Sequence, residues 1–156
     1  MNIKLSSLAA AVARLGGVSL VNERSEAGRF TSVRLAARWA LEGGSFPAPA
    51  LLLWPVDCPG VSSATISRLV AEAGAHSGTN IVPTHDGRAG HPVVLCDAFL
   101  TRLLAEGDEA NLREMMREGS VPRRFCAVED PAILDNVNTP EDYDVFLRAR
   151  AHPGRV

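Results

Sequence analysis

Short apolar runs alternate with amphipathic segments along most of this chain, and this alternation limits the fold more than any other feature of the sequence. The apolar runs are rich in Val, Ile and Leu and are bounded by Gly, Pro, Asn and Asp, which is typical of buried β-strands. We expect strands at residues 18–22, 50–56, 79–83, 91–96 and 123–129.

Between these runs, apolar residues recur at helical spacing. The expected helices cover residues 4–15, 31–42, a segment that begins at Ser62, 98–106, 109–118 and 138–151. Polar residues that can cap a first turn stand at most of their starts, and they are Thr31 or Ser32, Asp97, Asp108 and Thr139. The last helix has the strongest start, because Pro140 and Asp142 follow Thr139 in capping-box order.

This alternation predicts the α/β class, with a mostly parallel sheet covered by helices on both faces. The 156 residues, of which 46% are hydrophobic, suffice for one domain with a substantial core. The sequence contains no internal repeat, low-complexity tract or linker, so we expect a single domain over residues 1–156.

The composition excludes several classes of function. Sixteen basic and 18 acidic residues give a formal net charge of −2, without the clustered basic surface of a nucleic-acid-binding protein. The three cysteines are far apart in the chain and have no CxxC spacing, so neither a zinc site nor a disulfide framework is expected. Reduced cysteines favour a cytoplasmic location.

The N-terminal segment allows two interpretations. Lys4 followed by an apolar run resembles a short signal peptide with a cleavage site near Ala11–Ala13. However, Arg14 interrupts the run, and its apolar residues fall at helical spacing, which favours an amphipathic helix. No stretch is long and apolar enough for a membrane span, so no membrane partner is expected.

A carboxylate follows the most apolar predicted strand. Asp57 comes directly after the run "LLLWPV", and Pro59 and Gly60 turn the chain away from the sheet. Ligands of open α/β sheets collect at the carboxyl ends of the strands, where such a carboxylate is a suitable Mg²⁺ ligand. The alternative is that Asp57 caps the helix that begins near Ser62 or completes a turn.

Two further segments carry candidate site residues. "GRAGHPVVL" places His91, held rigid by Pro92, just before a predicted strand, although such histidines are more often structural than catalytic. In "NVNTPEDY" the alternation puts Asn136 and Asn138 on one side of an extended segment, where an amide oxygen can complete a magnesium shell. Turn and capping chemistry is the alternative, and it accounts only in part for Asn138.

Five segments, in this order and spacing, resemble the MobA-like NTP transferases, which include the molybdenum-cofactor cytidylyl- and guanylyltransferases. The resemblance covers about Leu8 to Leu147 and is carried by "NERSEAGRFTSVRLA", "LLLWPVDCPGVSSATISRLV", "IVPTHDGRAGHPVVL", "GDEANLREMMRE" and "NVNTPEDYDVF". It implies a Rossmann-like three-layer α/β/α sandwich. It also implies Mg²⁺-dependent transfer of CMP or GMP from CTP or GTP to a phosphorylated acceptor such as molybdopterin, with release of pyrophosphate.

The resemblance also implies roles for individual residues. Asp57 and Asn138 match the metal ligands, and Asp57 and His91 are the expected catalytic residues. Gly28, Thr31 and Ser32 match the segment that approaches the nucleotide, and Gly90 and His91 match the loop that faces the acceptor. Many relatives have Asp-x-Asp-Thr-Pro before the last helix. This chain has asparagines at those two positions, which lowers the negative charge that holds a metal.

One segment of the family pattern has no counterpart here. The family opens with a strand and a loop resembling Leu-Ala-Ala-Gly-x-Ser-x-Arg-Met-Gly, which cradles the triphosphate. Residues 1–17 look instead like a helix that precedes the family's third strand, so the fold is expected to be N-terminally truncated relative to the family. Loss of the first strand would leave an apolar sheet edge open and favour a homodimer.

Three explanations of the missing loop stay open at this point. The chain start is wrongly assigned or truly truncated, another chain supplies the segment, or the protein has become a non-catalytic binding or regulatory protein that keeps the fold. An unrelated α/β domain with similar turns and caps is a further alternative.

Overall fold

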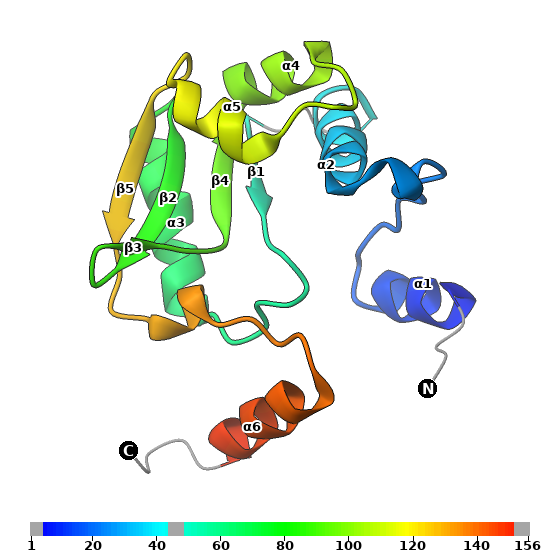
Figure 1. The fold of residues 1–156 in the computed structure, drawn as a ribbon, viewed down its shortest axis with the longest axis vertical. Helices are drawn as coiled ribbons and strands as arrows, with labels where there is room; N and C mark the ends of the chain where they lie inside the picture. Colours follow the sequence, from blue (N-terminus) through cyan, green and yellow to red (C-terminus); the bar gives the residue numbers. More distant parts are fainter. Residues whose placement is uncertain (1–4, 44–48, 152–156) are drawn as a thin grey trace.

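The computed structural model describes residues 5–43 and 49–151 (Figure 1). Its α-helices are α1 (Leu5–Arg14), α2 (Arg29–Arg38), α3 (Ser63–Ala75), α4 (Asp97–Ala105), α5 (Leu112–Glu118) and α6 (Pro140–Ala151). Its strands are β1 (Ala50–Leu53), β2 (Asn80–His85), β3 (Arg88–Ala89), β4 (Val93–Cys96) and β5 (Arg123–Ala127). Short 3₁₀ turns lie at Ser25–Ala27 and Pro131–Leu134, and a π-helical turn at Trp39–Gly43 continues α2.

The strands form one mixed sheet. β1 pairs with β4, β4 with β2, and β2 with both β3 and β5. β1 and β2 each run antiparallel to β4, whereas β5 is parallel to β2, so β1, β2 and β5 share one direction. β4 is reversed because the chain returns to it from β2 through a short hairpin, which is too short for the crossover that a parallel neighbour requires.

The hairpin between β2 and β3 was expected only as a turn-rich loop. Asp86 and Gly87 have φ angles of 47° and 73°, and His85 pairs with Arg88 across them. Two successive positive φ values between paired residues are the signature of a type I′ turn, for which Asp-Gly is a favoured sequence. The turn aims the following residues back along the sheet and leads the chain to Gly90 and His91.

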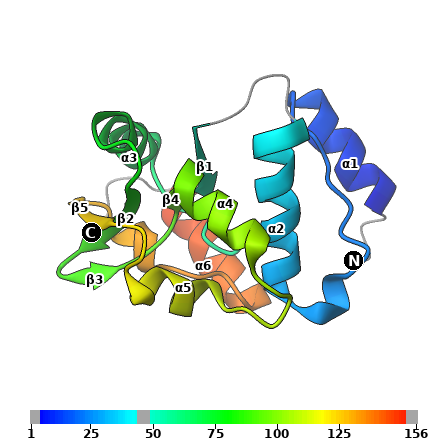
Figure 2. The same cartoon turned by 90° about the horizontal axis from the view of Figure 1, so that it is seen from above.

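Helices cover both faces of the sheet, as the two buried clusters show. Alternate strand residues face opposite sides: Val93 and Leu95 pack with α2, α4 and α5 residues on one face, and Val94 packs with α3 on the other. Figure 2 shows α3 on one side of the strands and α4 and α5 on the other. The predicted three-layer α/β/α arrangement is therefore confirmed.

Several local predictions were wrong, namely one strand and three helix caps. Neither Thr31 nor Ser32 caps α2, and Asp97 does not cap α4, because the N-cap positions are Gly28 and Cys96, without a side-chain cap hydrogen bond. Residues 18–22 form no strand, and Val18 and Val21 are 61% and 75% exposed, because no neighbouring strand in the described part of the chain lies beside them. Asp108 does not cap α5; Asn111 does, accepting a hydrogen bond from the Arg113 N–H at 2.9 Å. Asp108 instead pairs with arginines from other segments, a tertiary contact that sequence spacing does not reveal.

The starts of α3 and α6 agree with the prediction. The Ser62 hydroxyl accepts the Thr65 N–H at 3.2 Å at the start of α3. At α6, the Asp142 N–H donates to the Thr139 hydroxyl at 3.1 Å, and the Asp142 carboxylate accepts the Thr139 N–H at 2.9 Å. These reciprocal bonds form the expected capping box.

Asp130 ties the start of α3 to the turn after β5. Its carboxylate accepts hydrogen bonds from the Ser62 N–H at 2.9 Å, the Thr65 hydroxyl at 2.8 Å and the Ala132 N–H at 3.1 Å. Burial acts to raise the pKa of Asp130, but these three hydrogen bonds outweigh it and lower the pKa below its ordinary value of 3.8.

We therefore expect Asp130→Asn to lower the melting temperature at pH 7 and to have a smaller effect in acid. Because the folded-state pKa lies below the unfolded value, the carboxylate stabilises the fold above about pH 4 and loses this contribution as pH falls through the folded pKa. Thermal melts of both proteins between pH 7 and pH 3 test this. A difference that stays constant or grows towards pH 3 would contradict the role of the ionised group.

None of the helices in the described ranges has the length and apolar character needed to cross a membrane.

Candidate functional site

The turn after β1 and the segment before α6 meet at one edge of the sheet. The backbone N–H of Val137 donates to the carbonyl oxygen of Asp57 at 2.7 Å. β1 ends at Leu53, so this contact lies just beyond the carboxyl end of the strand, where α/β proteins place their ligands. The two segments that sequence analysis singled out separately are thus neighbours in space.

Cys58 joins the same two segments through its side chain. The thiol lies 3.0 Å from the Asn136 amide oxygen and 3.8 Å from an Asp57 carboxylate oxygen, and it is 1% exposed. Burial raises the pKa of the Cys58 thiol, and the charges of Asp57 and Asp135 raise it further. A neutral buried thiol is a weak nucleophile, so Cys58 acts as a packing and hydrogen-bonding bridge.

Gly90 and His91 approach the same region from the hairpin. The Gly90 N–H donates to the Pro83 carbonyl at 3.0 Å, and the His91 N–H donates to the Ile133 carbonyl at 2.9 Å. A Cβ on Gly90 would lie 2.2 Å from that Ile133 oxygen, which is closer than any real contact. Glycine at position 90 therefore allows the hairpin to pack against the turn that leads to Asp135.

The His91 side chain is partly buried and lies within electrostatic range of Asp57. Burial lowers the pKa of His91 below its ordinary value of 6.5, and Asp57 only partly opposes this effect. The imidazole is therefore largely neutral at pH 7. Its Nδ1 atom is buried and has no hydrogen-bond partner in the described part of the protein, so the ring keeps an unused polar atom beside the site.

Asp135 belongs to this region and was missed by sequence analysis. Its charge acts on the Cys58 thiol together with that of Asp57, which places both acids around the same side chain. The available signal was an acid directly before the alternating asparagines of "NVNTPEDY". We call the group formed by Asp57, Cys58, His91, Asp135 and the 136–138 segment the strand-end site.

Asn138 is placed differently from Asn136. Its backbone N–H donates to the Asp142 carboxylate at 3.0 Å, and the residue is exposed. Within residues 5–43 and 49–151, no group of three or more His, Cys, Asp or Glu side chains is arranged to hold a metal ion. A divalent ion at the strand-end site would thus need ligands beyond such side chains, as Mg²⁺ commonly has in amides, waters and phosphates.

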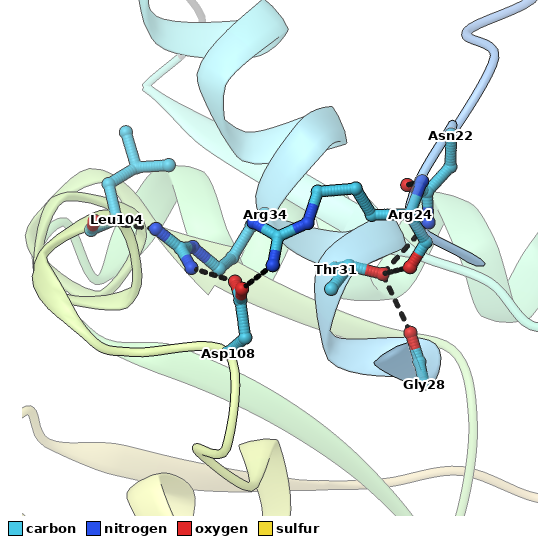
Figure 3. A network of polar contacts seen from close by, with 7 residues as sticks. All are labelled: Asn22, Arg24, Gly28, Thr31, Arg34, Leu104 and Asp108. Carbon is cyan, nitrogen blue, oxygen red and sulfur yellow. Dashed lines mark hydrogen bonds and ion pairs between the residues drawn. The ribbon is translucent and has the colours of Figure 1, made fainter. Parts of the chain in front are cut away.

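The other predicted nucleotide residues, Gly28, Thr31 and Ser32, lie in a second region at the start of α2, shown in part in Figure 3. Thr31 is buried, and its hydroxyl accepts the Asn22 amide at 2.9 Å and lies 2.8 Å from the Gly28 carbonyl. The same Asn22 amide donates to the Ser32 hydroxyl at 2.8 Å. Thr31 therefore anchors the preceding loop to the start of α2.

An arginine pair stands next to this anchor. Figure 3 shows Asp108, from the loop after α4, between the guanidinium groups of Arg24 and Arg34, and it forms an ion pair with each. Arg34 also lies 3.4 Å from the Leu104 carbonyl. Residues of this region line a cleft of about 290 Å³. No local sequence pattern predicts this cleft, because its charged residues come from three separate segments.

Comparison with known proteins gives a family and a fold. The family described as "MobA-like NTP transferase domain" matches residues 2–123. Among curated proteins, none matches the sequence.

Solved structures from mycobacteria share the fold. Rv0371c from Mycobacterium tuberculosis H37Rv has a TM-score of 0.68 at 23% identity, over 93% of this chain and 71% of that one. The same protein in complex with manganese has a TM-score of 0.63 at 22% identity, over 90% and 73% of the two chains. A homologue from Mycobacterium sp. strain JC1 has a TM-score of 0.61 at 20% identity, over 92% and 73%.

Proposed function

Because this chain belongs to the MobA-like NTP transferase family, we propose that it transfers CMP or GMP from CTP or GTP to a phosphorylated small molecule. The observation that carries the proposal is the contact between the turn bearing Asp57 and the segment that ends at Asn138. Molybdopterin is one example of the proposed acceptor. An acceptor oxygen forms a bond to the α-phosphorus, the bond between the α-phosphorus and its bridging oxygen breaks, and pyrophosphate leaves.

The residues at the strand-end site fit a divalent metal ion of the Mg²⁺ type. Asp57 supplies a carboxylate and the 136–138 segment supplies amide oxygens, which are the hard donors that Mg²⁺ and Mn²⁺ accept. One structural neighbour was solved in complex with manganese, which supports a divalent ion here. We assign Asp57 and Asn138 as its ligands. When bound, the ion supplies charge neutralisation for the phosphate oxygens.

His91 and Gly90 are proposed to face the acceptor. The lowered pKa of His91 leaves its ring neutral at pH 7, so one nitrogen can accept a proton or hydrogen bond while the other donates. Gly90 holds the histidine against the turn at Ile133, which limits its movement. The proposed contribution of His91 is to orient an acceptor oxygen towards the α-phosphorus, since phosphoryl-type transfer depends mainly on positioning.

Gly28, Thr31 and Ser32 are proposed to approach the nucleotide. Ser32 is exposed, and its hydroxyl retains a donor after accepting from Asn22. Thr31 acts through its neighbours, because its own hydroxyl is used within the protein. Gly28 is the N-cap residue of α2 and has a φ of 100°. Because glycine has no side chain that could cap the helix, the N–H groups of the first turn lack a side-chain cap from this position.

Two further features belong to the proposal. The three cysteines are free and buried, which supports a reducing, cytoplasmic location. β1 pairs only with β4 among the described strands, and its leucines are half-buried, so its open edge supports pairing with a second copy of the chain. Sedimentation velocity measures that association directly.

A non-catalytic binding protein of the same fold is the second candidate. The observation that favours it is that asparagines occupy positions 136 and 138 before the last helix, which lowers the negative charge that could hold a metal. Such a protein would bind the acceptor at the face of Gly90 and His91 without turning over a nucleotide.

The experiment that tests nucleotide binding is thermal melting with Mg²⁺ and CTP or GTP. A ligand that binds only the folded state at 100 times its Kd adds about 2.7 kcal/mol, or roughly 5–10 °C for a chain of this size. We expect this protection for the wild type and its loss in Asp57→Ala. Unchanged melting of the wild type, or equal protection of the variant, would contradict the proposed site.

A further inference from the structure

The cleft beside α2 has an excess of positive charge. Three arginines and two acids, Arg24, Arg34, Arg38, Glu23 and Asp108, line it, so its formal charge is +3 − 2 = +1. The whole protein has a formal net charge of −2. We call this region the arginine cleft. Its charge is opposite in sign to that of the protein around it, which points to an anionic ligand.

The arginines are only partly neutralised by their protein partners. Asp108 uses its two oxygens on Arg24 and Arg34, one for each guanidinium. Arg38 lies one helical turn after Arg34, and in the described part of the chain it has no acidic partner. Two like charges four residues apart on a helix repel each other, and an anion between them removes this cost.

Arg34 shows the same shortage of acceptors. Its side chain is 21% exposed, so its charge is largely removed from water. The Nε–H group is buried and has no acceptor among the described residues, although the terminal nitrogens reach Asp108 and the Leu104 carbonyl. A buried cationic donor without an acceptor is unfavourable, and a bound anion would satisfy it.

A phosphoryl group fits these donors better than a carboxylate. A phosphate monoester carries a charge of about −1.5 to −2 at pH 7 and three acceptor oxygens, which guanidinium groups bind in pairs. A carboxylate has two oxygens, and Asp108 already fills that role for two of the arginines. A cleft of about 290 Å³ also exceeds the size of a phosphate ion and leaves space for a small group attached to it.

We propose that the arginine cleft binds the phosphoryl group of a small phosphorylated molecule through Arg24, Arg34 and Arg38, with Asp108 holding two of them in place when no ligand is bound. Phosphate competes with Asp108 for the same guanidinium groups. The cleft shares Thr31 with the segment proposed to approach the nucleotide, but binding of a phosphoryl group here requires neither a metal nor Asp57.

Isothermal titration of the full chain with inorganic phosphate, ribose 5-phosphate and ribose, without metal or nucleotide and at low salt, tests this site. We expect both phosphate probes to bind and ribose not to bind. Equal affinities would mean that the cleft recognises the phosphoryl group alone, whereas tighter binding of ribose 5-phosphate would mean that it also contacts the attached group.

Two variants should change the affinity for phosphate in opposite directions. Arg38→Gln, at an exposed position, should weaken phosphate binding about tenfold, which matches the loss of one charged hydrogen-bond donor. Asp108→Asn should tighten it, because a competing carboxylate is removed. Arg113→Gln, an exposed arginine on α5 outside the cleft, is the matched control and should bind as the wild type does.

Three results would overturn the proposal. They are no heat of binding with either phosphate probe, the same affinity in Arg38→Gln as in Arg113→Gln, and weaker or unchanged binding in Asp108→Asn. The melting temperature of each variant is measured alongside. Should Asp108→Asn fail to fold, Arg24→Gln replaces it, because Arg24 is 66% exposed, and equal affinity in that variant also overturns the proposal.

Discussion

Replacing Gly90 by alanine lowers the stability of this protein by about 3 kcal/mol, the upper range for overpacking of a closely packed site. That loss corresponds to a fall in melting temperature of about 10 °C for a chain of this length. The added Cβ would lie 2.2 Å from the Ile133 carbonyl oxygen and 2.7 Å from its carbon, and both are backbone atoms. The clash is relieved only if the hairpin or the 131–134 turn moves, which breaks the His91-to-Ile133 hydrogen bond of 2.9 Å. Thermal and urea unfolding measure the loss.

The matched control for Gly90→Ala is Gly74→Ala. Gly74 lies in α3, and a Cβ there would meet nothing within 4 Å. The same substitution should therefore stabilise the protein, by roughly 0.5–1 kcal/mol, since alanine restricts the unfolded chain and favours the helix. If Gly90→Ala melts like the wild type, the hairpin does not pack against Ile133 as described.

The second large effect is expected on catalysis. Asp57→Asn keeps the size of the side chain and removes its charge, so the fold should persist while the site loses its strongest oxygen donor. We expect the rate of pyrophosphate release from CTP or GTP in the presence of acceptor to fall on the order of 10²–10³-fold, the usual range for loss of a group that stabilises transition-state charge. A coupled pyrophosphate assay at saturating Mg²⁺ measures this rate.

Asp144→Asn provides the control for charge alone. Asp144 is exposed on α6 and lies outside the strand-end site, so the same chemical change there should leave the rate unchanged. Equal rates for Asp57→Asn and the wild type, with measurable turnover, would show that another residue holds the metal. Turnover absent from the wild type, with Mg²⁺–NTP protection intact, would favour the non-catalytic alternative.

The strand-end site was predicted in part. Asp57 and the 136–138 segment were identified from their positions after a buried strand and before a capped helix, and the structure brings their backbones together. Asp135 was missed because an exposed acid beside a turn has no distinguishing spacing. Its importance depends on the charge that it adds around Cys58, which only the packing of the two segments creates.

The direction of β4 and the roles of Asp108 show where sequence reasoning fails. The apolar pattern of residues 91–96 predicted a strand but not its orientation, which follows from the short connection through the Asp86–Gly87 turn. Asp108 was expected to be a local helix cap. It pairs instead with Arg24 and Arg34, residues more than 70 positions away, so no local pattern contained this information.

The sequence by itself determined the α/β class, nearly every helix and strand, the caps of α3 and α6, and the family. These properties depend on hydrophobic periodicity, turn residues and ordered segments, which act over a few residues or are matched along the chain. Only the tertiary structure decided which polar groups meet: Asp57 with the segment before α6, Gly90 with Ile133, and the arginines of the cleft with Asp108. Such contacts join residues far apart in sequence, and packing of the core places them.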